Sequence, residues 1–379
     1  MSRKSSPPLA DELKPYVVPF RFDGTGEFHL KSHKTNEKGG LDKETATRII
    51  EANRKRLNDF QEKLYAQDRW SLLLIFQGMD AAGKDSAIKS VFEGVNPQGC
   101  EVTSFKQPST TELDHDFLWR SMVALPERGR IGIFNRSHYE ECLVVRVHPE
   151  ILAKQKIPPQ LVTRDIWKER FEDISAMENY LARNGTVILK FFLNVSREEQ
   201  RERFLERLED PAKNWKFSLA DIGERKLWAK YQAAYQDMIR HTSTRSAPWY
   251  VVPADHKWFA RVVIGSAAVR RPDDVHAWIA DFGVERVCCA FDVKASGDDF
   301  MVATDGWAAT ARQTLEDALA AYPPGTLRHI LVTDISRDGV LSGPNLALMQ
   351  SITRARPDLA LQASGGVAQL SDLAALRDA

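Results

Sequence analysis

Along the first two thirds of the chain, short apolar runs alternate with longer segments whose apolar positions recur at helical spacing. A short continuous apolar run is typical of a strand that is buried on both faces of a parallel sheet. The pattern therefore predicts an α/β protein whose parallel sheet has helices on both faces. The predicted strands are residues 71–77, 130–135, 186–195 and 249–254, and the predicted helices are residues 42–67, 85–95, 113–125, 164–183, 196–209 and 221–241.

Both ends of the chain depart from this pattern. Residues 1–40 are polar and rich in Gly and Lys, so we expect an irregular arm there. Lysine almost disappears after Lys257, with Lys294 as the single exception. Residues 261–379 contain 11 Lys and Arg against 15 Asp and Glu, a net charge of −4, so residues 1–260 carry +4. The change predicts a domain boundary near residue 262, although composition alone leaves sampling noise open as an alternative.

Composition narrows the class of protein. With 379 residues, 43% hydrophobic and 27% charged, the chain is typical of a globular protein of two domains or one large one. Its four cysteines form no C-x-x-C pair, so neither a zinc site nor a disulfide framework is expected. We find no signal peptide and no apolar run of membrane-spanning length, and expect a cytoplasmic protein without a membrane partner. A formal net charge of zero favours no particular partner, and we expect no nucleic acid.

The stretch FQGMDAAGKDSAIKS, residues 76–90, contains the pattern G-x-x-x-x-G-K between a predicted strand and a predicted helix. Gly78 and Gly83 let backbone N–H groups approach a phosphate closely, and Lys84 adds a full positive charge. The Ser or Thr that usually follows this lysine is replaced by Asp85, with Ser86 one place later. We predict a phosphate-binding loop, because the flanking elements disfavour a plain glycine turn with a surface lysine.

Two carboxylates in this loop, Asp80 and Asp85, would repel a phosphate. Mg²⁺ removes the conflict, because it binds oxygen ligands and usually takes one or two carboxylates together with phosphates. We therefore expect Mg²⁺ as cofactor and Asp80 as its ligand, directly or through water. Asp85 either supports the metal site from outside or is an acid favoured by the dipole at the helix N-terminus.

Further candidates follow the other predicted strands, and residues past the ends of parallel strands share one edge of a sheet. Arg136 suits a bidentate phosphate contact, with Asn135 before it. For Glu140 and Glu141, a role in the site and a role in capping the loop remain equally open. The segments expected to share one crevice are residues 78–86, 135–141 and 253–257.

Two arginines on the helix predicted at 196–209 are candidates for a lid. Arg203 and Arg207 are four residues apart and therefore share a helix face. A lid that closes over phosphates is one interpretation. A solvated charged helix is the other, because glutamates are interleaved with the arginines.

Six stretches make residues 15–262 resemble the second polyphosphate kinase family, the polyphosphate:nucleotide phosphotransferases. The resemblance implies a P-loop kinase-like fold with a helical lid, and Mg²⁺-dependent transfer of the terminal phosphoryl group of inorganic polyphosphate to an adenine nucleotide. Asn135, where other branches carry Asp, resembles the branch that accepts both AMP and ADP. The matching stretches are GMDAAGKD, VNPQGCEVTSFKQPS, ELDHDFLWR, RGRIGIFNRSHYEECLVVRVHP, DPAKNWKFS and APWYVVPADHKWFAR.

By position, the resemblance makes Asp80, Lys84 and Arg136 catalytic. It places Lys106 and Arg120 on the nucleotide side, makes either Arg203 or Arg207 the lid arginine, and closes the site with two residues after the last strand. The phosphate- and nucleotide-binding residues that it implies are Gly78, Gly83, Asp85, Ser86, Lys106, Arg120, Asn135, Arg203, Arg207, Asp255 and Lys257.

The chemistry of the acceptor agrees with this assignment. Its phosphate is already anionic, so catalysis needs positioning and charge neutralisation rather than a strong base. We expect polyphosphate and adenine nucleotides as partners, and a homo-oligomer. Two alternatives remain, an ATP-dependent nucleotide kinase of the same fold and a misfolding chimera without activity.

From residue 261 the stretches RVVIGSAAVRRPDDVHAWIADFGVERVCCAFDVK, HILVTDISRDGVLSGPNLALM and LALQASGGVAQLSDLAALR resemble another enzyme family. This is the phosphoribosylformimino-aminoimidazole-carboxamide ribotide isomerase of histidine biosynthesis, a (β/α)8 barrel. The resemblance covers strands four to seven of eight. It implies relics of an isomerase site at Asp292, Thr333, Asp338, Gly365 and Gly366.

An incomplete barrel leaves open sheet edges, because only closure removes them. We therefore expect residues 263–379 to be a partial barrel fragment without isomerase activity, since the first-strand acid is also absent. At the join, residues 261–267 suit both the last kinase helix and the fourth barrel strand. We expect the helix, because the preceding segment leads into one.

Overall fold

The computed structural model describes residues 13–211, 214, 218–269, 285, 288–296, 299–304, 309–320, 322, 324–338, 340 and 343–377. The chain divides into two compact units, residues 1–269 and 270–379. Each unit is described by itself. Over the described residues, every helix is too short or too polar to cross a membrane.

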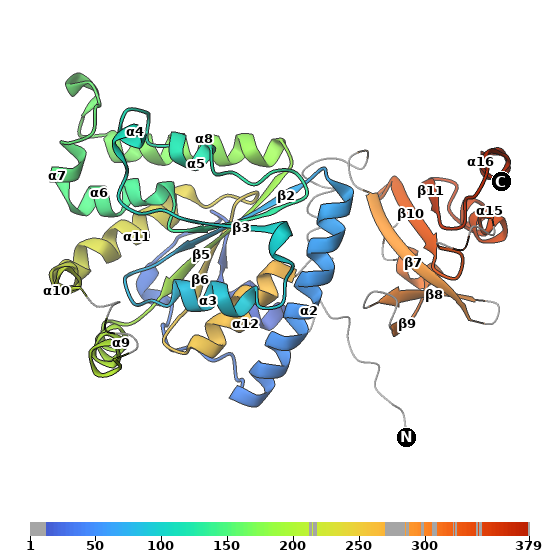
Figure 1. The fold of residues 1–379 in the computed structure, drawn as a ribbon, viewed down its shortest axis with the longest axis horizontal. Helices are drawn as coiled ribbons and strands as arrows, with labels where there is room; N and C mark the ends of the chain where they lie inside the picture. The colour runs from blue at the N-terminus through green and yellow to red at the C-terminus, as the bar shows by residue number, and fades with distance from the viewer. Residues whose placement is uncertain are drawn as a thin grey trace. The chain divides into compact units, whose positions relative to one another are not determined.

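Unit 1 contains a six-stranded sheet with the strand order β1-β6-β5-β2-β4-β3 (Figure 1). All neighbouring strands are parallel except β1, which pairs antiparallel with β6. The predicted α/β class with a mostly parallel sheet is therefore confirmed, with an antiparallel edge that was not predicted. The strands are β1 (Arg21–Phe22), β2 (Ser71–Gln77), β3 (Cys100–Ser104), β4 (Ile131–Asn135), β5 (Thr186–Asn194) and β6 (Trp249–Pro253).

Helices cover both faces of this sheet (Figure 1), with α2, α3 and α12 packed together on one face and α6, α8 and α11 on the other. The helices are α2 (Lys43–Gln67), α3 (Lys84–Val91), α4 (Thr110–Leu113), α5 (Trp119–Met122), α6 (Val144–Val147), α7 (Pro149–Leu152), α8 (Ile166–Arg183), α9 (Arg197–Glu209), α10 (Leu219–Lys226), α11 (Trp228–Thr242) and α12 (Lys257–Val269). Short 3-10 helices are η1 (Lys14–Tyr16), η2 (Val18–Phe20), η3 (Leu30–Ser32), η4 (Pro97–Gly99), η5 (His138–Cys142) and η6 (Pro159–Leu161).

Three expectations for unit 1 need correction. The helix predicted at 113–125 is two short helices, α4 and α5, because the Asp116 side chain accepts from the Leu118 N–H and forms a local turn between them. The helix predicted at 221–241 is divided at Leu227 into α10 and α11. The arm predicted as irregular has short elements from residue 14 onward, and side chains such as Phe20 and Phe28 pack into the main core.

The helix expected at the join is present. Helix α12 runs from Lys257 to Val269, so residues 261–267 are helical and belong to unit 1. Val263 and Ile264 are fully buried in the core of unit 1, and the Asn53 side chain donates to the Ser266 hydroxyl at 3.0 Å. Packing against α2 and α3 thus explains why this segment is a helix rather than a strand.

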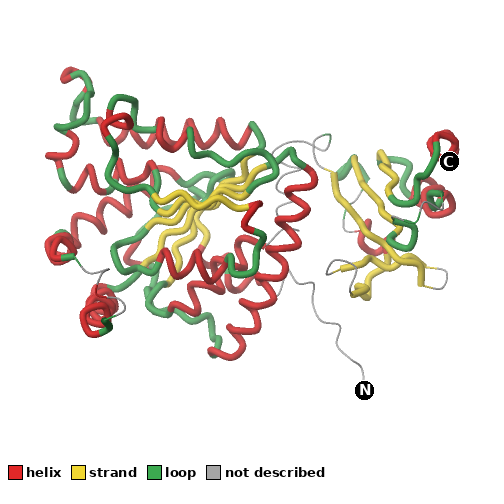
Figure 2. Tube along the Cα trace, in the orientation of Figure 1, coloured by secondary structure: helices red, strands yellow, loops and turns green. Residues whose placement is uncertain are grey.

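Unit 2 contains a five-stranded sheet with the order β11-β10-β7-β8-β9, and Figure 2 shows its strands in yellow. Strand β10 pairs parallel with β7 and β11, whereas β7, β8 and β9 are joined antiparallel. The strands are β7 (Cys288–Ser296), β8 (Asp299–Thr304), β9 (Ala309–Thr314), β10 (His329–Asp334) and β11 (Ala360–Ser364). The helices of this unit are α14 (Leu315–Ala320), α15 (Leu346–Ala355) and α16 (Leu370–Arg377).

Candidate functional site

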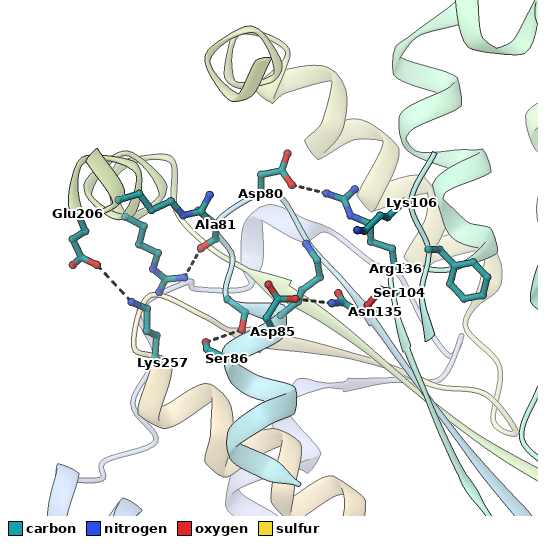
Figure 3. Close-up of a pocket in the computed structure, with 15 residues that line it drawn as sticks. Asp80, Ala81, Asp85, Ser86, Ser104, Lys106, Asn135, Arg136, Glu206 and Lys257 are labelled. Carbon is teal, nitrogen blue, oxygen red and sulfur yellow. Dashed lines mark hydrogen bonds and ion pairs between the residues drawn. The ribbon is translucent and has the colours of Figure 1, made fainter. Parts of the chain in front are cut away.

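A cleft of about 400 Å³ opens where β2 and β4 end, and Figure 3 shows its side chains. Eleven of the predicted site residues meet there, although they come from five separate parts of the chain. The lining residues are Asp80, Ala81, Gly83, Lys84, Asp85, Ser86, Ser104, Phe105, Lys106, Asn135, Arg136, Arg203, Glu206, Arg207 and Lys257. The expected shared crevice at the ends of the strands is therefore present.

The loop between β2 and α3 has a backbone shape that depends on its glycines. Gly78 has a φ of 156° and Gly83 a φ of 104°. A Cβ at Gly78 would lie 3.0 Å from the Leu193 carbonyl oxygen on β5, so the loop can pass this strand only with glycine there. A turn is closed by the Ala82 N–H, which donates to the Met79 carbonyl at 3.1 Å. The chain then enters α3 at Lys84.

The Lys84 side chain is folded onto its own loop. Its ammonium group donates to the carbonyl oxygens of Gly78 at 2.7 Å and Met79 at 3.3 Å, and the residue is 8% exposed. Burial, together with the positive charge of Arg136, lowers the pKa of Lys84 to about 8. The charge at the centre of the loop is therefore poorly hydrated, a condition that strengthens its attraction for an anion.

The acids of the loop are each held by a residue at the end of β4 or directly after it. The Asp80 carboxylate lies 2.5 Å from an Arg136 guanidinium nitrogen (Figure 3). Arg136 also contacts Glu140 at 3.0 Å. The charge of Glu140, with that of Asp80, raises the pKa of Arg136 above its ordinary range. The Asn135 amide donates to the Asp85 carboxylate at 2.6 Å. Asn135 therefore orients an acid of the loop in the ligand-free protein.

The two glutamates that sequence reasoning left open have different surroundings. Glu140 contacts Arg136 beside the cleft. Glu141 is buried and pairs with Arg170 at 2.8 Å, while Gln155 donates to the same carboxylate at 2.7 Å. Glu140 is thus a neighbour of the site, and Glu141 holds helix α8 to the segment around η5.

The cleft offers suitable oxygen donors for Mg²⁺. Asp80 and Asp85 both line it, on either side of Lys84 along the loop. Within the described part of the chain, no group of three or more His, Cys, Asp or Glu side chains could hold a metal ion by itself. Because Mg²⁺ usually completes its shell with phosphate oxygens and water, one or two carboxylates suffice. The donor set fits a Mg²⁺ ion that binds together with a phosphate substrate.

Lys106 and Arg120 lie at the side of the cleft formed by β3. Lys106 lines the cleft, whereas Arg120 is buried behind it and donates to the Lys106 carbonyl at 2.8 Å. The Arg120 guanidinium lies 5.4 Å from the centre of the Phe105 ring. Arg120 also lines a second cavity of about 410 Å³, whose wall includes Arg170 and several carboxylates. Arg120 therefore separates two cavities instead of facing the first.

Three more predicted residues come from α9 and from the end of β6. Arg207 lines the cleft and lies 3.8 Å from the Asp221 carboxylate. Lys257 also lines it, 3.8 Å from Glu206. Asp255 does not line the cleft: its carboxylate accepts from the Ser196 N–H at 2.8 Å, one residue before α9 begins. Asp255 therefore fixes the start of α9.

Sequence reasoning missed two kinds of residue. Ser104 and Phe105 line the cleft at the end of β3, a strand whose exposed residues left no continuous apolar run to detect. Beneath the loop after β4, the buried ammonium of Lys190 contacts Glu178 at 2.6 Å, and the Tyr139 hydroxyl donates to the same carboxylate at 2.7 Å. The signal that the sequence offered for this buried pair was Lys190 itself, a charged residue within an otherwise apolar predicted strand.

In unit 2 the residues matching an isomerase lie on neighbouring strands. Asp292 and Thr333 are directly paired in the register of β7 and β10. Gly365 follows β11 with a φ of 89°, and a Cβ there would lie 3.0 Å from the Asp334 carbonyl oxygen. The Gly366 carbonyl accepts from the Gly343 N–H at 2.9 Å, while Asp338 lies in the turn after β10. The structure thus brings these residues to one edge of the sheet.

Two family models match the chain. Residues 40–275 match Polyphosphate kinase 2, and residues 255–379 match Histidine biosynthesis protein. The two matches overlap at residues 255–275, the segment around the join at 261–267, which was expected to suit both.

Known proteins similar to this chain support the first match. An ADP-polyphosphate phosphotransferase of Rhodopseudomonas palustris is 52% identical over 223 residues, covering 59% of this chain and 77% of that protein. An AMP/ADP-polyphosphate phosphotransferase of Meiothermus ruber is 42% identical over 252 residues, covering 66% and 90%. The crystal structure of Polyphosphate Kinase 2 from Arthrobacter aurescens TC1 superposes with a TM-score of 0.61 at 37% identity, covering 67% of this chain and 88% of that one. The chain therefore belongs to the polyphosphate kinase 2 family, and its C-terminal residues match the family of histidine biosynthesis proteins.

Proposed function

We propose that this protein transfers the terminal phosphoryl group of inorganic polyphosphate to AMP, ADP or both. The observation that carries the proposal is the convergence of Lys84, Lys106, Arg136, Arg207 and Lys257 on one cleft that also contains three carboxylates. A polyphosphate chain is a polyanion without a base to recognise, so clustered positive charge is sufficient to bind it. The names of the Rhodopseudomonas and Meiothermus relatives support the donor and the acceptors.

The reaction needs charge neutralisation and alignment. An oxygen of the acceptor phosphate attacks the terminal phosphorus of the chain, a new P–O bond forms, and the bridging P–O bond breaks to release a shorter polyphosphate. The attacking oxygen is already anionic, so the protein need not remove a proton. Lys84 and Arg136 neutralise the charge of the transferred group, and the loop backbone around Gly83 orients it.

Asp80 is the proposed ligand of Mg²⁺, and the metal would neutralise phosphate oxygens when bound. In the structure the Asp80 carboxylate is paired with Arg136, so the residue that would hold the metal lies beside a guanidinium that can bind phosphate. Asp85 also lines the cleft and would support the metal site from outside.

The second cavity suits the nucleoside of the acceptor. Arg120 lines this cavity and holds the backbone of Lys106, so an acceptor could place its phosphate at Lys106 and its nucleoside beyond Arg120. Carboxylates on the wall of the cavity favour hydroxyl and amino groups over a second polyanion. They include Glu112, Asp114 and Asp116.

Helices α9 and α10 form the proposed lid, because Glu206 and Arg207 reach the cleft from α9. Unit 2 is proposed to be a partial barrel fragment without isomerase activity. Only β7, β10 and β11 are parallel among its described strands, and the segment that matches a fourth barrel strand is helical. Leu370 on α16 is 84% exposed, as expected for an element without its barrel neighbours. A homo-oligomer and a cytoplasmic location stay predictions.

A panel of donors and acceptors tests the proposal on the full-length protein. Polyphosphate and ATP are compared as donors, AMP and ADP as acceptors, each with Mg²⁺ and with a chelator. We expect turnover with polyphosphate and Mg²⁺, and its loss with the chelator. Turnover with ATP alone would instead support a nucleotide kinase of the same fold, and no turnover with any pair would support an inactive chimera.

A further inference from the structure

Helix α9 binds the backbone of the phosphate loop through two side chains. Gln200 donates to the Asp80 carbonyl at 2.9 Å, and Arg203 donates to the carbonyls of Ala81 at 2.9 Å and Ala82 at 2.8 Å. Three successive carbonyl groups of the loop are therefore held from one face of α9. Gln200 and Arg203 are 1% and 4% exposed, so these bonds are shielded from water.

Arg203 has no donor left for a phosphate. Its Nη1 makes the two loop bonds, its Nη2 donates to the carbonyls of Ala254 and Asp255, and its Nε donates to Glu199 at 2.8 Å. A guanidinium has five N–H donors, and these five bonds use all of them. Binding of a phosphate by Arg203 would require the loss of a buried hydrogen bond.

These bonds determine where the loop's N–H groups point. In a planar trans peptide, the N–H of one residue points opposite to the carbonyl of the residue before it. By fixing the Ala82 carbonyl, Arg203 therefore also fixes the direction of the Gly83 N–H, which belongs to the part of the loop that lines the cleft. Ala81 has a φ of 61°, a left-handed conformation that is uncommon for alanine and needs such support.

We propose that Arg203 and Gln200 are positioning residues that hold the phosphate loop in its binding shape, and that Arg207 is the arginine of α9 that contacts the polyphosphate chain. Both arginines line the cleft, but Arg207, one turn beyond Arg203, has a side chain that is 22% exposed, against 4% for Arg203. The assignment of Arg207 to the polyphosphate chain rests on the proposed function. The positioning role of Arg203 and Gln200 does not, because it can be measured without substrate.

The first experiment measures hydrogen exchange of the backbone amides of residues 78–86 without substrate. Arg203→Gln and Arg207→Gln are a matched pair, because each removes one positive charge from the same helix. We expect Arg203→Gln to increase the exchange rate of this loop and Arg207→Gln to leave it unchanged. Equal exchange in the two variants would overturn the positioning role, whatever the substrate of the enzyme proves to be.

The second experiment measures how the dissociation constant of polyphosphate depends on salt. Each ionic contact with a linear polyanion contributes about one unit to the slope of log Kd against log salt concentration. We expect Arg207→Gln to lower this slope by about one. Arg203→Gln should leave the slope unchanged and lower kcat by about 100-fold, the effect of a misplaced reacting group. A slope lowered by Arg203→Gln would show that Arg203 contacts the phosphate chain and would refute the assignment.

Gln200→Met keeps the proposal testable if Arg203→Gln fails to fold. It removes the bond to the Asp80 carbonyl, and also the bond that Gln200 accepts from Arg225 at 3.0 Å, while preserving side-chain length and net charge. We expect a smaller increase in the exchange rate of the loop than in Arg203→Gln, and an unchanged salt dependence of the dissociation constant. We expect kcat to fall by about tenfold, the effect of losing the one hydrogen bond that Gln200 makes to the loop. Unchanged exchange at residues 78–86 in Gln200→Met would contradict the role of α9.

Discussion

The parallel strands of the two units are buried to different extents. In unit 1, strand β2 is buried along all of Ser71–Gln77, between helices on both faces. In unit 2, strand β7 has only Cys289 and Val293 buried, although its sequence begins with an apolar run. A run of apolar residues thus does not reveal whether both faces of a strand are covered.

The comparison also shows what turns strand ends into a site. In unit 1 the loop after β2 is held by side chains from α9, and the segment after β4 rests on the buried pair of Lys190 and Glu178. In unit 2 the described supports of the turn after β10 are less buried: the Asp334 carboxylate accepts from the exposed Ser336 in the turn and from the half-buried Asn345 at the start of α15. Precise positioning comes from support outside the loop itself.

The largest expected effect concerns the boundary between the units. Truncation after residue 262 removes Val263 and Ile264, whose burial stabilises unit 1 by about 3–6 kcal/mol, and this is a large part of a typical stability. We expect that truncation to give unfolded or insoluble protein, while truncation after residue 269 keeps α12 and its fold. Circular dichroism and thermal melting of the two truncated proteins measure the difference. Equal melting temperatures would mean that the end of α12 does not stabilise unit 1.

Removal of the loop lysine should come next in size. Lys84→Met removes the charge nearest the transferred group, and we expect kcat to fall by about 1,000-fold. Lys89→Met is the matched control, because Lys89 is an exposed lysine of the same helix. Initial rates with polyphosphate and ADP measure both. A Lys84→Met enzyme as active as the Lys89→Met enzyme would remove the loop from the mechanism.

The pH dependence of polyphosphate binding also tests the role of the Lys84 charge. Because the pKa of Lys84 is lowered to about 8, its charge is lost as the pH rises through that value, and the dissociation constant should then rise by up to about tenfold per pH unit. This rise should be absent in Lys84→Met.

The free energy of unfolding should become more favourable to the folded protein as the pH rises, whereas binding weakens. The folded pKa is below 10.5, so burial of the charged lysine costs stability below pH 8, and that cost declines between pH 8 and 10.5.

The smallest expected effect is in unit 2. Asp338→Asn alters a residue that matches an isomerase, in a turn of a unit that we propose to be inactive. We expect kcat and KM for polyphosphate and ADP to change by less than about twofold, as for most surface substitutions. Steady-state kinetics measures this. A larger change would show that unit 2 contributes to the kinase reaction.

Much of the site could be predicted because its chemistry is local in the sequence. Gly78, Gly83 and Lys84 lie within one short motif between a strand and a helix, so spacing alone identified them. Strand β3 could not be predicted in the same way, because it lies at the edge of the sheet and its residues are mostly exposed. Asp255 was assigned to the site by resemblance, yet its carboxylate caps the start of α9.

The amino-acid sequence by itself determined the α/β class, the phosphate loop and the change of character near the join, because these depend on neighbouring residues and on the period of apolar positions. Only the tertiary structure decided how far α12 extends, which of Glu140 and Glu141 lies beside the cleft, and that Arg203 binds the loop's carbonyls while Arg207 is more exposed. Two arginines four residues apart have the same chemistry. Arg203 differs from Arg207 by its bonds to a segment more than 100 residues away, and a local pattern contains no information about such contacts.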